Sequence, residues 1–252
     1  MKKINITEEY FLQQNRIKFS DIIHSDKNKK IVLKNKKSKS NINKKNDKMS
    51  DYKTNDNNEI RSEKLREIYL EVKKCMKCEK LCKTRLNVVF GRGDENPDIV
   101  FVGEAPGADE DRLGFPFVGR AGKLLDRWID ELKINKYNFY IMNALKCRPP
   151  ENRDPLPEEK TNCRNFFVKQ LETLNPKIIC ALGRHGFGNL VEFDLKTPFG
   201  KARNTIHYYN NNGKEVPVIA TYHPAYVLRN QKEEIKVIND LEFMLKELNN
   251  IK

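Results

Sequence analysis

The stretch Ile99-Val100-Phe101-Val102-Gly103-Glu104-Ala105-Pro106-Gly107 joins a run of four apolar residues to a glycine-containing turn. An apolar run of this length, bounded by turn residues, is typical of a strand that is buried on both faces of a parallel sheet. Three further runs of four to six mostly apolar residues occur at 139–142, 178–182 and 216–221. The sequence therefore predicts four buried strands.

Segments with a helical spacing of apolar residues lie before, between and after these runs. They occupy 60–72, 121–132, 157–174, 184–191 and 231–248. Strands that alternate with helices predict an α/β fold with a largely parallel sheet. In such a sheet, ligands bind beyond the carboxyl ends of the strands.

The N-terminal quarter of the chain has a different composition. The chain has 252 residues and a net charge of +13, of which +7 falls within residues 1–60. Ten lysines lie between positions 27 and 48, with few apolar residues among them to offset the entropy cost of ordering. We therefore expect a disordered basic extension at 1–58 and one folded domain at 59–252. Such an arm can add salt-sensitive affinity for nucleic acid, but a solvated extension with no binding role is the simpler interpretation.

The composition also excludes several classes of protein. No run approaches the roughly 18 apolar residues that a membrane-spanning helix needs, and the N-terminus lacks the apolar core of a secretory signal. Neither a Gly-x-Gly-x-x-Gly motif nor a phosphate-binding Gly-Lys-Ser/Thr loop occurs. Six cysteines are too few for a disulfide-rich secreted scaffold. We expect a cytoplasmic, monomeric protein with no membrane segment and no nucleotide cofactor.

Polar residues follow three of the four predicted strands. Glu104 comes after the first, Asn143 after the second and His223 after the last. Because the carboxyl ends of parallel strands meet at one edge of a sheet, we expect a carboxylate, an amide and an imidazole to face one crevice. Taken singly, Asn143 is explained as a turn residue and His223 as a structural histidine. Their joint occurrence favours a functional site.

Four cysteines have a spacing suited to metal binding. Cys75 and Cys78 form a Cys-x-x-Cys pair, and Cys147 and Cys163 follow far downstream. Four thiolates bind either one zinc ion or a [4Fe–4S] cluster, and the spacing alone leaves both open. Cys180 falls inside a predicted strand, where we expect a small buried apolar residue.

Four segments together resemble the family-4 uracil-DNA glycosylases, the iron–sulfur members of the uracil-DNA glycosylase superfamily. They are Val102-Gly103-Glu104-Ala105-Pro106-Gly107, Pro116-Phe117-Val118-Gly119-Arg120-Ala121-Gly122, the segment 143–153, and Ala220-Thr221-Tyr222-His223-Pro224-Ala225. The similarity covers about residues 70–248. It implies a three-layer α/β/α fold around a four-stranded, largely parallel sheet. It also implies hydrolysis of the N-glycosidic bond of uracil in DNA, which leaves an abasic site.

The resemblance implies a [4Fe–4S] cluster held by Cys75, Cys78, Cys147 and Cys163. The segment after Cys78 is one residue longer than is usual in the family, which leaves a Cys78/Cys82 pair as an alternative. We expect the cluster to have a structural role.

The resemblance also suggests roles for the site residues. It implies that Phe117 stacks on a uracil flipped out of the DNA. The Asn143 amide can bond the O4 and N3–H edge of the ring, with the backbone of residues 103–105 (Gly103, Glu104 and Ala105) near O2 and N3. His223 is the candidate donor to the negative charge that develops on O2. Ala105 stands where other branches have Asp, so the carboxylate that positions water is Glu104 or Glu110.

Other residues are expected to touch the DNA or to be structural. The stretch Tyr226-Val227-Leu228-Arg229 is the candidate minor-groove wedge. The candidate phosphate contacts are Arg120, Arg148, Arg153 and Arg229. His207 is expected to be structural, and the lack of an inserted histidine-bearing loop after Asn143 predicts release of free uracil without a covalent DNA adduct.

Two rival interpretations use the same features. One is a non-catalytic iron–sulfur protein that binds DNA with a glycosylase-like fold, which would need the basic surface but not Glu104, Asn143 and His223 together. The other is a zinc module joined to a generic α/β domain.

Overall fold

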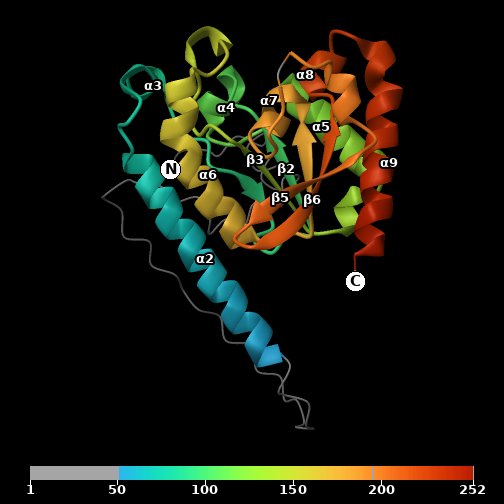
Figure 1. Ribbon diagram of the computed structural model, residues 1–252. Helices are drawn as coiled ribbons and strands as arrows, with labels where there is room; N and C mark the ends of the chain where they lie inside the picture. The colour runs from blue at the N-terminus through green and yellow to red at the C-terminus, as the bar shows by residue number, and fades with distance from the viewer. Residues whose placement is uncertain (1–50, 195, 252) are drawn as a thin grey trace, which may run out of the picture. The chain divides into compact units, whose positions relative to one another are not determined.

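The computed structural model describes residues 51–194 and 196–251 (Figure 1). The chain divides into two units, Met1–Glu59 and Ile60–Lys252. The predicted basic extension lies outside the described residues up to position 50. Helix α2 (Asp51–Lys74) begins eight residues before the predicted domain start at 59.

The second unit is built on a six-stranded mixed sheet with the order β1-β3-β2-β4-β6-β5. Its strands are β1 (Arg92–Gly93), β2 (Ile99–Gly103), β3 (Phe139–Asn143), β4 (Ile178–Leu182), β5 (Ile206–Asn211) and β6 (Lys214–Thr221). The pairs β2–β3, β2–β4 and β4–β6 are parallel, and β1 and β5 pair antiparallel at the two edges.

The α/β prediction is confirmed, but the predicted sheet of four strands is too small. The four predicted strands form its parallel centre. The two edge strands escaped prediction because β1 has only two residues and β5 carries polar residues at most of its positions. Neither therefore contains a buried apolar run.

Helices cover both faces of the sheet (Figure 1). Alternate strand residues point to opposite faces, so Val100 and Val102 pack with one set of helices while Ile99 and Phe101 pack with another. The first face is covered by α6 (Pro157–Leu174) and α7 (Gly183–Gly188), and the second by α5 (Arg120–Glu131) and α9 (Glu234–Asn250). The short helices are α3 (Glu79–Thr84), α4 (Ala108–Leu113) and α8 (Pro224–Val227). None of the described helices is long and apolar enough to cross a membrane.

The register of the parallel strands aligns their carboxyl ends. Gly103 pairs with Asn143, and Leu182 pairs with Thr221. Because the strands end together, the segments that follow them leave the sheet from one edge. The predicted polar residues are therefore delivered to the same side of the molecule.

A buried ion pair anchors the end of β6. Arg203 donates to both carboxylate oxygens of Asp240 at 2.7 and 2.9 Å, and Thr221 donates to Asp240 Oδ2 at 2.7 Å. The Asp240 side chain is fully buried. The guanidinium of Arg203 also lies 4.6 Å from the centre of the Tyr222 ring. Helix α9 is thus tied to the last two residues before His223.

We predict that Asp240→Ala lowers the free energy of unfolding by about 3–5 kcal/mol, because it leaves the Arg203 charge buried without its partner. Urea denaturation measures the loss. Glu242→Ala, an exposed position on the same helix, is the matched control and should change stability by less than about 0.5 kcal/mol. Equal stabilities of the two variants would contradict this assignment.

Candidate functional site

Gly103, Phe117, Asn143 and His223 come together beyond the carboxyl ends of the strands, and we call this group the strand-end site. A Cβ atom added at Gly103 would lie 2.3 Å from Asn143 Oδ1 and 2.8 Å from Phe117 Cζ. The rings of Phe117 and His223 lie 5.5 Å apart, centre to centre, with an angle of 35° between their planes. Residues from separate segments of the predicted site are therefore neighbours in space.

Phe117 has a backbone conformation that a non-glycine residue rarely adopts, with a φ of 54°. Such a conformation costs of order 1–3 kcal/mol and persists only where the surroundings enforce it. Arg92, buried and paired with Asp126, donates to the carbonyl oxygens of Pro116 at 2.9 Å and Phe117 at 3.3 Å. A Cβ at Gly122 would lie 1.9 Å from Phe117 O, so that position admits only glycine.

Glu110 holds the two glycine-containing turns together. Its Oε1 accepts hydrogen bonds from the backbone N–H groups of Val118 and Gly119, both at 2.9 Å, and its Oε2 accepts from Gly107 N at 3.1 Å. Both carboxylate oxygens are therefore engaged by backbone donors. Glu110 therefore connects the turn at Gly107 to the turn that follows Phe117.

Asn143 is almost completely buried at the end of β3. Its Oδ1 atom is buried and has no hydrogen-bond partner among the described residues. A buried polar atom without a partner is costly, and in a native site it indicates a ligand or water that completes the bond. The backbone carbonyl of Asn143 accepts a hydrogen bond of 2.6 Å from the ammonium of Lys146, which is fully buried.

His223 presents a neutral imidazole with a defined tautomer. The packed protein around the ring removes water and, with a smaller effect from the positive charge of Arg229, lowers the pKa of His223 to about 4. Its Nδ1 accepts a hydrogen bond from Ala225 N at 3.1 Å. The proton of the neutral ring is therefore on Nε2, which is available as a donor.

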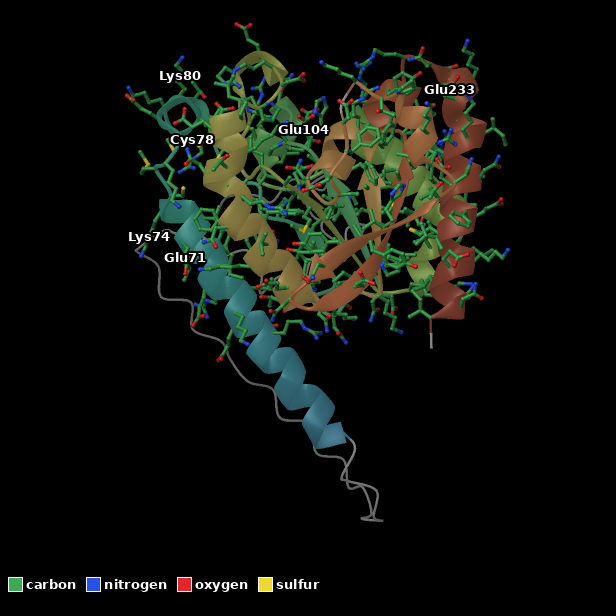
Figure 2. The ribbon with its side chains drawn as sticks, in the orientation of Figure 1. Glu71, Lys74, Cys78, Lys80, Glu104 and Glu233 are labelled. Carbon is green, nitrogen blue, oxygen red and sulfur yellow. The ribbon has the colours of Figure 1, made fainter. Side chains whose placement is uncertain are left out.

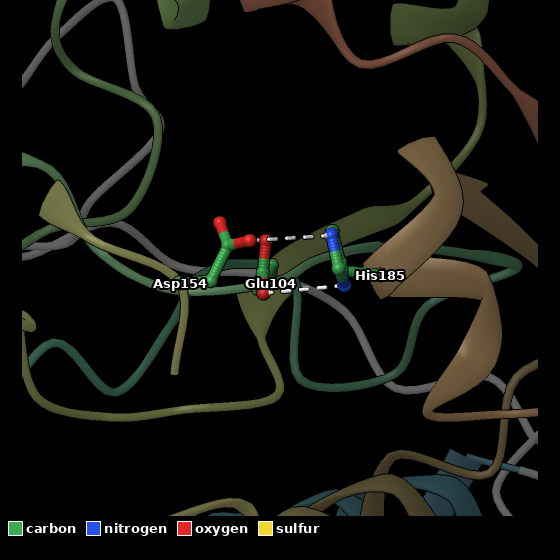
Figure 3. A group of neighbouring side chains, drawn as sticks. All are labelled: Glu104, Asp154 and His185. Atoms are coloured by element: carbon green, nitrogen blue, oxygen red, sulfur yellow. Dashed lines mark ion pairs between the residues drawn. The ribbon is translucent and has the colours of Figure 1, made fainter. Parts of the chain in front are cut away.

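Glu104 extends toward helices α6 and α7, where it meets Asp154 and His185 (Figure 3). Glu104 Oε1 lies 3.6 Å from His185 Nδ1 and 4.0 Å from Lys160 Nζ, and His185 Nε2 lies 4.0 Å from Asp154 Oδ2. Burial raises the pKa of Glu104 to about 7, although the positive charge of Lys160 acts in the opposite direction. This carboxyl can therefore change its charge near neutral pH.

The four predicted metal-binding cysteines line one cavity. Cys78 lies directly before α3 (Figure 2), Cys75 precedes it, Cys147 follows β3, and Cys163 lies in α6. Cys82 also lines this cavity, and all five of these thiols are free of disulfides. The Cys78/Cys82 alternative therefore stays open in the structure.

No three of the described cysteine sulfurs lie as close together as they would around one bound zinc ion. Sulfurs bound to one zinc ion at about 2.3 Å lie about 3.8 Å apart in a tetrahedron. Among the described residues, no three cysteine sulfurs lie within 4.8 Å of one another. Arg85 donates to Cys147 Sγ at 3.0 Å and Asn162 donates to Cys78 Sγ at 3.6 Å, so two of the sulfurs already have donors suited to thiolates.

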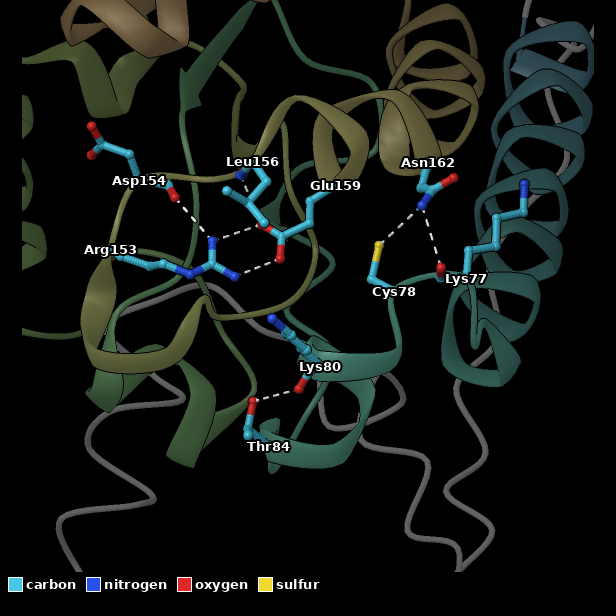
Figure 4. A network of polar contacts seen from close by, with 9 residues as sticks. All are labelled: Lys77, Cys78, Lys80, Thr84, Arg153, Asp154, Leu156, Glu159 and Asn162. Carbon is cyan, nitrogen blue, oxygen red and sulfur yellow. Dashed lines mark hydrogen bonds and ion pairs between the residues drawn. The ribbon is translucent and has the colours of Figure 1, made fainter.

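A polar network supports the segment between β3 and α6 (Figure 4). Arg153 donates to both carboxylate oxygens of Glu159, at 2.6 and 2.9 Å, and Leu156 N donates to Glu159 at 2.8 Å. Arg153 and Arg148, which donates to Asn152, are thus engaged within the protein. Of the four arginines predicted to contact phosphate, Arg120 and Arg229 are the exposed ones.

Several residues that line the cysteine cavity or surround Glu104 were not predicted from the sequence. They are Arg85, Lys146, Asp154, Lys160 and His185. His185 had a usable signal, because Gly183-Arg184-His185 follows the predicted strand at 178–182 at the same edge of the sheet. Lys146 and Arg85 had none, since a buried lysine and an arginine near a thiol look like ordinary surface residues in sequence.

The uracil DNA glycosylase superfamily model matches residues 90–248. The chain is 47% identical over 168 residues to the type-4 uracil-DNA glycosylase of Archaeoglobus fulgidus, which covers 66% of this chain and 84% of the relative. It is 46% identical over 184 residues to the type-4 enzyme of Thermotoga maritima, over 71% of this chain and 93% of the relative. The type-5 uracil-DNA glycosylase of Thermus thermophilus is more distant, at 31% identity over 54% of this chain and 68% of the relative. The chain therefore belongs to the uracil-DNA glycosylase superfamily and, within it, to the type-4 branch.

Proposed function

We propose that this protein removes uracil from DNA by hydrolysing the N-glycosidic bond of a deoxyuridine flipped out of the helix. The observation that carries the proposal is the buried, unpartnered Oδ1 of Asn143 beside the rings of Phe117 and His223. An amide acceptor, an aromatic face and an imidazole donor are the groups that a flipped uracil requires. The names of the type-4 relatives support the same activity.

Binding of the base uses Phe117 and Asn143. The Phe117 ring offers a stacking surface, and stacking on such a ring contributes about 1–3 kcal/mol per base. Asn143 Oδ1 can accept the uracil N3–H while its amide nitrogen donates to O4. Cytosine has the opposite donor and acceptor pattern on this edge, so a fixed amide disfavours it.

Bond cleavage leaves positive charge on the sugar and negative charge on uracil O2. His223 donates from Nε2 to O2, and it does so as a neutral group because its pKa is about 4. A donor that is already in place when charge develops is commonly the largest contribution to catalysis. The attacking water requires a carboxylate. The Glu104 carboxyl accepts no backbone hydrogen bond among the described residues, whereas both oxygens of Glu110 accept backbone N–H groups.

Four free thiols that line one cavity are a donor set that fits a [4Fe–4S] cluster held by Cys75, Cys78, Cys147 and Cys163. When bound, this group would supply a covalent link between the segment before α3, the segment after β3 and helix α6. Lys146 connects that link to the site, since it precedes Cys147 and donates to the carbonyl of Asn143. The role is structural in this proposal.

The segment after His223 contacts the DNA in this proposal. Tyr226 in α8 and Leu228 after it are large, exposed side chains. A side chain that fills the space left by the flipped base must be large and exposed in this way. Arg229 is exposed next to them and can contact phosphate. All of these groups come from one chain, so we propose that a monomer acts on uracil-containing DNA.

We predict that His223→Ala lowers the single-turnover rate of uracil release by about 10²–10³-fold, because the charge on O2 loses its donor. The rate is measured on a labelled uracil-containing oligonucleotide. His207→Gln is the control, since His207 bonds Ala202 O at the sheet edge, and it should retain the wild-type rate. No uracil release from folded wild-type protein that still binds DNA would favour the non-catalytic alternative.

We predict that Asn143→Asp lowers the uracil rate by about 10- to 100-fold and introduces measurable cytosine release, because a carboxylate accepts from the cytosine amino group but cannot donate to uracil O4. Parallel assays on uracil- and cytosine-containing oligonucleotides give the ratio. Asn249→Asp makes the same charge change at an exposed position and should leave the ratio unchanged. An unchanged ratio in Asn143→Asp would remove this residue from base recognition.

The cluster assignment predicts different results for two cysteines that line the same cavity. Cys75→Ser should lose the visible absorbance and most of the iron of the purified protein, because it removes a ligand. Cys82→Ser should retain both. Iron and zinc analysis of anaerobically purified protein measures the outcome. Loss of iron in Cys82→Ser with retention in Cys75→Ser would assign the pair to Cys78 and Cys82, and zinc in place of iron would refute the cluster.

A further inference from the structure

The remaining parallel strand, β4, also delivers a side chain to the edge of the sheet at which the strand-end site lies. His185 lies in the first turn of α7, three residues after β4 ends at Leu182. A Cβ at Gly186 would lie 2.6 Å from Val102 O, so α7 packs directly on the end of β2, the strand that leads into Glu104. The close approach of helix and strand brings His185 Nδ1 to 3.6 Å from Glu104 Oε1 (Figure 3).

Both atoms of this contact are buried and have no hydrogen-bond partner among the described residues. Two unpartnered polar atoms that face each other inside a protein are costly unless a proton lies between them. The second nitrogen of His185 lies 4.0 Å from Asp154 Oδ2, which limits how the ring can turn. Glu104 and His185 are therefore each other's nearest complementary group.

This contact concerns the carboxylate that the reaction requires. The oxygens of Glu110 accept three backbone N–H groups, so Glu110 is fixed as a part of the loop structure. Glu104 Oε1 faces His185, which leaves Oε2 as the oxygen that can hold a water molecule. Fixing Oε1 thus fixes the direction in which Oε2 points.

We propose that His185 is a positioning residue that orients the Glu104 carboxylate by hydrogen-bonding its Oε1 and stabilises its ionised form. This inference rests on the proposed glycosylase function and assigns a role within it. His185 does not touch the substrate in this scheme. It acts only through Glu104.

The charges around the pair set the expected pH dependence. Lys160 and Arg164 from α6, Arg184 from α7 and Asp154 from the preceding segment surround Glu104 and His185. Burial raises the pKa of Glu104 to about 7 and lowers the pKa of His185. Glu104 holds water as a carboxylate, so the rate of uracil release should rise as the pH rises through about 7.

The test is the pH profile of the single-turnover rate for wild type and for His185→Ala, with chelator present and with DNA affinity measured separately. We expect His185→Ala to move the midpoint of the profile up by about one pH unit, since the ionised carboxylate loses a donor. The rate at pH 7 should fall about 5-fold and recover at high pH, while DNA affinity stays the same. His185→Gln, which retains a donor, should return the midpoint toward the wild-type value.

Two control variants separate positioning by His185 from a general loss of structure. Glu104→Gln should lower the rate and abolish the dependence on pH near 7, and His207→Gln should leave the profile unchanged. A His185→Ala profile that superimposes on wild type, or that falls equally at every pH with a lower melting temperature, would overturn the positioning role while leaving the glycosylase function intact. A wild-type rate that requires an added divalent cation would reassign Glu104, Asp154 and His185 to metal binding and also overturn it. Absence of uracil release by wild type would instead refute the proposed function itself.

Discussion

The parallel register of β3, β2, β4 and β6 is the constraint on which the rest of the structure depends. Hydrogen bonds between these strands align Gly103 with Asn143 and Leu182 with Thr221. Because alternate side chains of these strands pack into two different clusters, one on each face, a shift by one position would exchange the two sets and disrupt both. The register therefore fixes where each chain segment leaves the sheet, and with it the positions of the polar residues that follow.

The five residues from Asn143 to Cys147 contribute both to the strand-end site and to the cysteine cavity. Asn143 contributes an amide to the strand-end site, and Cys147 lines the cysteine cavity. Between them the buried Lys146 donates to the carbonyls of Asn143 and Phe90. A distortion on the cysteine side of this segment would therefore reach the amide through a chain of direct bonds, without any larger movement of the fold.

Prediction from the sequence succeeded where the residue types of a segment indicate its secondary structure and burial. Apolar runs located the four central strands, and Pro157 with its acidic neighbours located helix α6 with the correct bounds. It failed where the environment comes from distant segments. Arg92 and Glu110, which hold the strained Phe117, and the Glu104–His185 contact depend on loops that meet only in the folded chain. Of the backbone partners of Glu110, Gly107 belongs to a capping box at the start of α4, whereas Val118 and Gly119 lie in the next turn, which the sequence does not show to fold back onto this helix.

The glycines around the strand-end site limit the substitutions that the chain tolerates. At Gly103, Gly122 and Gly186, an added Cβ would lie less than 3 Å from a site side chain or a backbone atom. Every missense mutation in a glycine codon adds at least that one carbon. A side chain at Gly122 or Gly186 would therefore displace backbone, and one at Gly103 would displace the Asn143 and Phe117 side chains, so a change at any of the three positions alters the geometry around the strand-end site.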